Sequence, residues 1–198
     1  YEDNGSIKDD IKQLWIPALV SVFSIICLVL QADLGSALIF FGIILSMLYV
    51  ATSKKLYVFL SLGGASAGAV LAYNLFAHVR NRVMIWRNPW DYANDAGYQL
   101  VQSLYAISSG GLIGSGLGQG FVENIPVNDS DFIYAAICEE FGIIFSVGLM
   151  IVYFLLFFRG IRAAYVTNDK FSQLAVVGFS TMIACQTLVI IGGIFGVI

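Results

Sequence analysis

Carboxylates gather at the start of one apolar run and could carry acid–base chemistry. Asp129 and Asp131 precede the run that begins at Phe132, and Glu139 and Glu140 lie inside it. A carboxylate at such a border can act as a general base towards a bound hydroxyl group. It can equally cap a helix by accepting hydrogen bonds from the free N–H groups of the first turn. Residue type and spacing leave both interpretations of Asp131 open.

Glu139 and Glu140 are expected well inside the helix that this run predicts. At roughly 100° per residue, Glu139 lies about 80° around the helix from Asp131, and Glu140 lies nearly opposite Asp131. Both lie about 12–14 Å beyond Asp131 along the axis. Carboxylates this deep in an apolar helix are expected to face protein or water rather than lipid.

Arginine and tryptophan alternate over residues 82–91, where Arg82, Trp86, Arg87 and Trp90 stand close together. Both residue types are typical of membrane interfaces, where they anchor a chain. Guanidinium groups also bind phosphate through two parallel hydrogen bonds. The stretch therefore predicts either an interfacial anchor or a binding site for a phosphate-bearing lipid.

Two further motifs follow along the chain. The first runs over 97–103 and contains Tyr98, Gln99 and Gln102, and the second is a glycine-rich run over 108–120. The glycine run has no preceding strand and lacks the Gly-Lys-Ser/Thr ending, so it is neither a dinucleotide fingerprint nor a P-loop. We interpret it as a flexible re-entrant loop close to a ligand, because glycine permits close backbone approach.

Asp33 lies in the motif over 31–37, directly before another apolar run. Its position favours the role of a helix N-cap, in which the carboxylate accepts hydrogen bonds from the first turn.

The composition excludes a water-soluble domain. The chain is 59% hydrophobic and 12% charged, with a mean hydropathy of +0.83. Soluble domains are roughly 45–50% apolar and about 25% charged. The small net charge of −3 does not indicate a nucleic-acid partner. The three cysteines lie in apolar runs without CxxC spacing, and His78 is the single histidine, so neither a disulfide nor a His-rich metal site is expected.

The apolar runs predict an all-α integral membrane protein, a polytopic helix bundle with about five transmembrane helices. Each run approaches or exceeds the ~20 residues that cross a bilayer, and backbone groups in lipid must be paired within a helix. Because the sequence starts without Met and ends inside an apolar run, we interpret it as a fragment of a longer chain. The expected spans are about 14–31, 34–52, 56–77, 132–158 and 171–198.

The remaining segment, 80–130, is expected to be a large loop on one side of a single membrane domain, 1–198. Within it, residues 98–107 predict a short amphipathic helix lying on the membrane. If successive helices cross the membrane in alternating directions, seven basic residues lie on one side and three on the other. Because basic residues favour the cytoplasmic side, the side with three, which carries the loop, is expected outside. The larger set is Lys8, Lys12, Lys54, Lys55, Arg159, Arg162 and Lys170, and the smaller is Arg80, Arg82 and Arg87.

Small residues in the third expected span predict tight helix packing. Gly64 and Gly68 form a small-xxx-small pair flanked by Ala65, Ala67 and Ala69. Such surfaces let two helix backbones approach closely in a membrane.

Taken in order, these motifs resemble the SEDS family, the RodA/FtsW/SpoVE group. The family pattern reads Gln-Pro-Asp-Leu-Gly-Thr-Ala, then Arg followed by Trp-x-Pro-Trp, Gly-Tyr-Gln-Leu-x-Gln-Ser, Gly-x-Gly-x-Gly and His-Thr-Asp-Phe-Ile, followed by Glu-Glu-Leu-Gly. This chain has the corresponding motifs at 31–37, 82–90, 97–103, 114–118, 129–135 and 139–142.

The resemblance implies a ten-helix protein of the bacterial cytoplasmic membrane. Such proteins polymerise lipid II into glycan strands of peptidoglycan for growth, division or sporulation, with a class B penicillin-binding protein, a transpeptidase, as partner. Asp131 matches the family's essential catalytic acid. Arg82 and Arg87 would hold the leaving polyprenyl diphosphate, with a divalent cation such as Mg²⁺ or Mn²⁺, although the sequence shows no closed metal-ligand set. The other expected substrate-binding residues are Trp86, Tyr98, Gln99, Gln102 and Glu139.

The chain departs from the family pattern at several positions. Val127 and Asp129 replace a glutamate and a histidine, Ala32 replaces a proline and Ser36 replaces a threonine. These changes suggest a divergent paralogue. Two alternative functions are a lipid II flippase, for which Glu139 and Glu140 would line a passage, and a noncatalytic membrane scaffold for a transpeptidase.

The basic-residue division predicts that the 80–130 segment faces the cell exterior. A Ser115→Cys variant in an otherwise cysteine-free chain should react with a membrane-impermeant maleimide in intact cells. Labelling that requires cell lysis would reverse the predicted topology.

Overall fold

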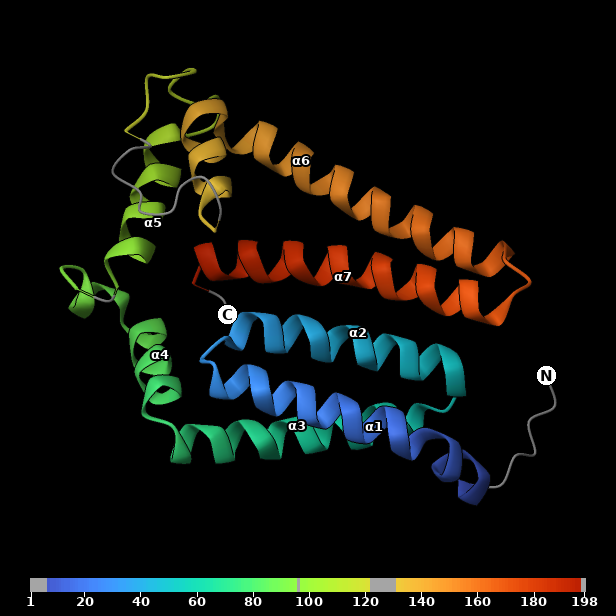
Figure 1. The fold of residues 1–198 in the computed structure, drawn as a ribbon. Helices are drawn as coiled ribbons and strands as arrows, with labels where there is room; N and C mark the ends of the chain where they lie inside the picture. Colours follow the sequence, from blue (N-terminus) through green and yellow to red (C-terminus); the bar gives the residue numbers. More distant parts are fainter. Residues whose placement is uncertain (1–6, 96, 122–130, 197–198) are drawn as a thin grey trace.

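The computed structural model describes residues 7–95, 97–121 and 131–196, and every regular element among them is helical (Figure 1). Asp129 and Val127 lie outside the described residues. The fold class predicted from composition is confirmed. The helices in chain order are α1 (Ile7–Leu30), α2 (Leu34–Thr52), α3 (Lys55–Leu75), α4 (Ala77–Arg87), the 3-10 helix η1 (Pro89–Tyr92), α5 (Tyr98–Gly110), α6 (Ile133–Val166) and α7 (Lys170–Ile194).

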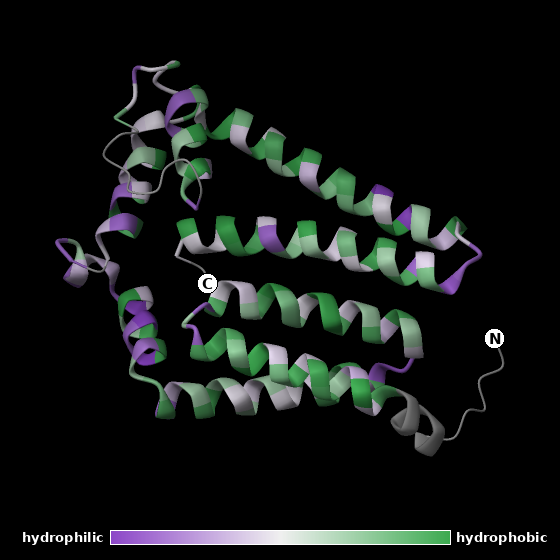
Figure 2. Cartoon of the chain, in the orientation of Figure 1, coloured by the Kyte–Doolittle hydropathy of each residue, from purple (hydrophilic) through white to green (hydrophobic). Residues whose placement is uncertain are grey.

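Four described helices are long and apolar enough to cross a membrane, namely α2, α3, α6 and α7. The first expected span corresponds to the apolar part of α1, Leu14–Leu30, which is shorter. Figure 2 shows hydrophobic residues along these helices and hydrophilic ones on α4, on η1 and at the turns. Large apolar side chains such as Phe59 and Phe179 remain 69% and 67% exposed. Surfaces of this kind are stable when they face lipid.

Helix α7 lies between α6 and α2 and holds the bundle together, while α1 and α3 both contact α2 (Figure 1). Glycines permit these approaches. A Cβ at Gly160 of α6 would collide with Ser180 of α7, and a Cβ at Gly42 of α2 would lie 2.7 Å from the sulfur of Cys185. The approach of α7 to its two neighbours therefore depends on small residues of α2 and α6.

The expected glycine packing surface on α3 is not used within the described part of the chain. A Cβ added at Gly64 or Gly68 would meet no described atom within 4 Å, and α3 has no buried residue. The prediction of tight packing was wrong for this chain, because the small-xxx-small spacing states only that close approach is allowed and does not say which partner is present.

The two sets of basic residues lie at opposite ends of the bundle. Arg80, Arg82 and Arg87 belong to α4, which runs with η1 and α5 across the end that we call the loop end (Figure 1). The opposite end, which we call the basic end, contains the α2–α3 turn with Lys54 and the α6–α7 turn beside Lys170. The helix alternation behind the topology prediction is therefore present, and its sidedness stays a prediction.

The 80–130 segment is more ordered than a loop. Helix α4 starts at Ala77, two residues after α3 ends, and α5 fills 98–110. The expected helix over 98–107 is thus present, but one face of it packs on the start of α6, where Ala106 and Ile107 join the buried cluster around Ala135 and Cys138.

Packing of α6 on α7 makes a matched pair of glycine substitutions informative. Gly160→Ala should lower the melting temperature in detergent, because Ser180 blocks the new methyl group and overpacking costs about 1–3 kcal/mol. Gly148→Ala on the same helix meets no described atom within 4 Å, so improved helix propensity should leave stability equal or higher. Equal melting temperatures for the two variants would contradict the α6–α7 contact.

Candidate functional site

Helix α6 is broken at Gly142, whose backbone has φ 81° and ψ 169°. The break divides the element into a short helix over 133–141 and a long helix that continues to Val166 (Figure 1). A broken helix exposes the carbonyls of its last turn and the N–H groups of the next first turn. In a membrane these groups need partners, since lipid offers none.

The glycine loop, residues 111–121, supplies those partners. The backbone N–H groups of Ser115 and Gly116 donate to the carbonyls of Glu139 and Glu140, at 2.9 and 3.1 Å. In the other direction, the N–H of Ile143 donates to the carbonyl of Gly111 at 3.0 Å. The N–H of Ile144 donates likewise to the carbonyl of Leu112, at 3.3 Å. The loop therefore completes both sides of the break.

Glycine is required at the points of closest contact. Gly114 has φ 92°, and a Cβ there would collide with the carbonyl oxygen of Glu140. A Cβ at Gly142 would lie 2.5 Å from the backbone nitrogen of Gly114. The glycine run is thus explained by backbone packing on the helix break, and its expected proximity to a ligand stays a prediction.

Both glutamate side chains hold the glycine loop. Glu139 is 3% exposed, and its Oε1 accepts hydrogen bonds from the N–H of Phe121 at 2.9 Å and the hydroxyl of Ser109 at 3.3 Å. Oε1 of Glu140 accepts one from the N–H of Gly118 at 3.0 Å. The Oε2 atom of Glu139 is buried without a hydrogen-bond partner among the described residues.

The expectation that Glu139 faces protein rather than lipid is confirmed. The single straight helix expected over 132–158 was wrong, because the helix breaks directly after Phe141. The depth of Glu139 in the membrane stays a prediction. A glycine inside a long apolar run is a sequence signal for such a break. Sequence reasoning gave Gly142 no role.

Asp131 lies in the turn before α6 with an exposed side chain. The residue at the N-cap position of α6 is Phe132, and no side chain caps this helix. The helix-cap interpretation of Asp131 therefore does not describe this structure, and the carboxylate is left available at the loop end.

Asp33, in contrast, is the N-cap that its sequence position predicted. Its Oδ1 accepts a hydrogen bond from the N–H of Ser36 at 3.0 Å. Hydrogen bonds from Ser36 hold the pKa of Asp33 below its ordinary value, and the positive charge of Arg82 acts in the same direction. The preceding residue, Ala32, has φ 62°, which a proline could not adopt.

The predicted binding residues occupy the helices that cross the loop end. Arg82, Trp86 and Arg87 are exposed on α4. The next element, η1, contacts α5 through Trp90, which meets Tyr105 edge to face with ring centroids 5.8 Å apart. Helix α5 carries Tyr98 and Gln99, which are exposed, and Gln102, which is half-buried. The structure thus places these residues at the same end as Asp131. Their role in binding stays a prediction.

The described residues contain no group of three or more His, Cys, Asp or Glu side chains that could hold a metal ion. Glu139 and Glu140 direct Oε1 to loop donors, and Asp131 is exposed and belongs to no such group among the described residues. These residues do not form a ligand set for a divalent cation. The cation expected from the resemblance stays a prediction.

Comparison with known proteins now decides the family. The model of the family FTSW_RODA_SPOVE, described as "Cell cycle protein", matches residues 2–198. The chain belongs to this family. Within the FTSW_RODA_SPOVE group it is 36% identical over 173 residues to "Peptidoglycan glycosyltransferase RodA" of Mycobacterium tuberculosis, which covers 87% of this chain and 37% of that protein.

Two other members of the group are similar to this chain. "Stage V sporulation protein E" of Bacillus subtilis is 35% identical over 188 residues, covering 93% of this chain and 51% of that protein. "Probable peptidoglycan glycosyltransferase FtsW" of Geobacter metallireducens is 32% identical, covering 85% and 45%. The chain therefore spans between 37% and 51% of the length of these three relatives.

A solved structure shares the fold of this chain. It was described as "Structural coordination of polymerization and crosslinking by a peptidoglycan synthase complex" and superposes with a TM-score of 0.75 at 24% identity. The match covers 98% of this chain and 55% of the other. Together with the apolar helices, family membership makes this a multi-pass membrane protein.

The contacts of Glu139 predict how the glycine loop is held. Glu139→Ala leaves the N–H of Phe121 without its acceptor, and such a hydrogen bond contributes about 1 kcal/mol between neutral groups and up to about 3 kcal/mol when one group is charged. Amide hydrogen exchange of peptides within 111–121 should therefore accelerate by roughly fivefold to a hundredfold.

Two variants serve as controls for that measurement. Glu139→Gln keeps an accepting oxygen and should exchange nearly as the wild type does. Glu140→Ala loses one exposed hydrogen bond, to Gly118, and should have the smaller effect. Unchanged exchange in Glu139→Ala would show that backbone pairing alone fixes the loop.

Proposed function

We propose that this chain forms the catalytic part of a peptidoglycan glycosyltransferase that polymerises lipid II into glycan strands. The observation that carries the proposal is the carboxylate of Asp131, which is exposed at the loop end and does not cap α6. Similar members of the family are named peptidoglycan glycosyltransferases. A carboxylate in this position is free to meet a substrate hydroxyl group.

The reaction we propose is a glycosyl transfer with Asp131 as general base. A sugar hydroxyl of one lipid-linked disaccharide attacks the anomeric carbon at the end of the growing strand. Its proton passes to the carboxylate of Asp131 as the new carbon–oxygen bond forms. The bond between the anomeric carbon and the diphosphate breaks, and polyprenyl diphosphate leaves with the electron pair.

Cationic side chains at the loop end suit this leaving group. Arg82 and Arg87 are exposed on α4 and can pair with diphosphate oxygens through two parallel hydrogen bonds. Trp86, on the same helix and 45% exposed, suits the membrane interface where the lipid head group lies. Tyr98, Gln99 and Gln102 on α5 offer hydrogen-bonding groups for the sugars.

Glu139 supports the site indirectly in this proposal. Its Oε1 is used by Phe121 and Ser109, so its contacts favour holding the glycine loop over touching the substrate. The flippase alternative relied on Glu139 and Glu140 lining a passage. It is weakened, because both carboxylates already bind the loop. The experiment on Asp131 distinguishes the glycosyltransferase from the alternative of a noncatalytic scaffold.

We further propose that the protein resides in the bacterial cytoplasmic membrane with its loop end outside. A class B penicillin-binding protein is the proposed partner, since the similar structure was described as part of a peptidoglycan synthase complex. Polymerisation and crosslinking at one membrane face would let the new strand pass directly to the transpeptidase.

The function is tested by Asp131→Asn in the full-length protein reconstituted with lipid II. Asparagine is nearly isosteric but does not take up a proton at neutral pH. The rate of glycan polymerisation should fall by roughly 10²–10⁴-fold, the usual contribution of a general base. The melting temperature should stay unchanged, because the exposed Asp131 caps no helix.

Asp129→Asn is the matched control and should reduce the rate less, because the family pattern has histidine there. A polymerisation rate near the wild-type value in Asp131→Asn would remove Asp131 from catalysis. A wild-type protein without any polymerisation would favour the scaffold.

A further inference from the structure

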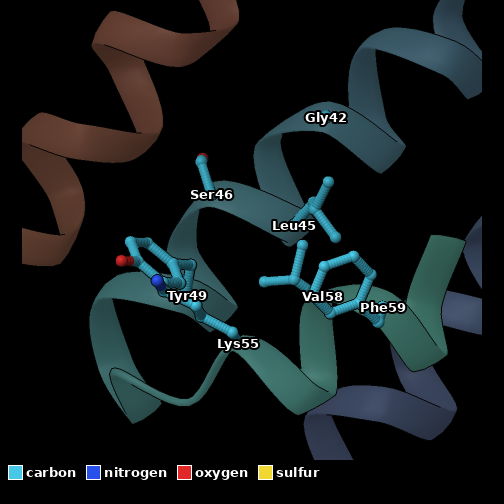
Figure 3. A pocket seen from close by; sticks show the side chains of 7 residues that line it. All are labelled: Gly42, Leu45, Ser46, Tyr49, Lys55, Val58 and Phe59. Carbon is cyan, nitrogen blue, oxygen red and sulfur yellow. The ribbon is translucent and has the colours of Figure 1, made fainter.

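An apolar cavity of about 430 Å³ lies between α2 and α3 towards the basic end of the bundle, away from Asp131 (Figure 3). The two helices are joined by a short turn at Ser53 and Lys54, yet they leave this space open between them. The lining residues are Gly42, Leu45, Ser46 and Tyr49 of α2, and Lys55, Val58 and Phe59 of α3.

The cavity has an apolar part and a polar end. Leu45, Val58 and Phe59 form the apolar part, and Tyr49 and Lys55 lie beside each other at its other side (Figure 3). Neither the hydroxyl of Tyr49 nor the ammonium of Lys55 has a hydrogen bond or ion pair within the described part of the chain. A cationic and a hydroxyl group beside an apolar cavity match a molecule with an anionic head and a hydrocarbon tail.

The start of α3 strengthens this charge match. The N-cap position is held by Lys54, whose side chain does not cap the first turn. Lys55 is the first residue of the helix, where the helix dipole also favours an anion and disfavours a cation. An anion bound here would interact favourably with this end of the helix dipole and with the charge of Lys55.

The lining of the cavity suits a hydrocarbon chain. A single chain can lie against Leu45, Val58 and Phe59.

We propose that the cavity between α2 and α3 binds an anionic phospholipid. Its phosphate pairs with Lys55 and the hydroxyl of Tyr49, and one acyl chain lies along the apolar lining. The site is separate from the proposed catalytic end, so the proposal goes beyond polymerisation and does not depend on it.

The probe is phosphatidylglycerol, compared with phosphatidylcholine that carries the same acyl chains. The full-length protein, purified in detergent, is titrated with each lipid, and retained lipid is measured by native mass spectrometry. Lys55→Gln should weaken phosphatidylglycerol binding by about fivefold, since one lysine near an anionic lipid contributes roughly that factor. Arg159→Gln removes a basic residue that does not line the cavity, and it should leave the binding unchanged.

The position of the acyl chain is tested separately. Two variants in detergent each carry one introduced tryptophan, at Phe59→Trp beside the cavity or at Phe158→Trp, an exposed position of α6. Brominated phosphatidylglycerol should quench the tryptophan at position 59 at a lower lipid concentration than the tryptophan at position 158. Lys55→Gln in the Phe59→Trp background should remove the difference.

Three outcomes would overturn the proposal. They are equal binding of the two lipids, equal effects of Lys55→Gln and Arg159→Gln, and equal quenching at the two tryptophans. Equal quenching would indicate that another protein segment covers the cavity. Because the readouts are lipid binding and fluorescence, an inactive polymerase would not affect the result.

Discussion

Backbone pairing across the break in α6 is the interaction on which the loop end depends. A helix interrupted at Gly142 carries unpaired carbonyl and N–H groups that lipid does not satisfy, so a second segment must approach within hydrogen-bonding distance. The glycine loop does this through bonds in both directions, from Ser115 to Glu139 and from Ile143 to Gly111. Side chains at Gly114 or Gly142 would prevent the approach.

This pairing also supports the proposed chemistry. The short helix that follows Asp131 is joined to the glycine loop by its own carbonyls and by the carboxylates of Glu139 and Glu140. Packing of α5 on the same short helix adds an apolar contact through Ala106 and Ile107. The turn that carries Asp131 therefore starts from a fixed element, while its carboxylate stays exposed. Rigid support with a free functional group is what a general base requires.

The two ends of the bundle differ in chemistry as well as in shape. The loop end carries the arginines of α4 and the exposed aromatic and amide groups of α4 and α5, and Asp33 caps α2 in the electrostatic field of Arg82. At the basic end, Lys55 starts a helix whose first turn has no side-chain cap. We propose a lipid-linked sugar for the first end and an anionic phospholipid for the second. Both ligands combine phosphate with hydrocarbon.

The amino-acid sequence was enough to predict the fold class, the approximate helix limits, the separation of the basic residues and the capping role of Asp33, because these follow from local composition and spacing. It did not determine that α6 breaks at Gly142, that the glycine run closes this break, or that Asp131 is no cap. It also wrongly assigned tight packing to Gly64. Each of these points depends on which distant segment supplies a hydrogen bond or a packing partner. Spacing along one chain segment does not specify that partner, so the three-dimensional arrangement was needed to identify it.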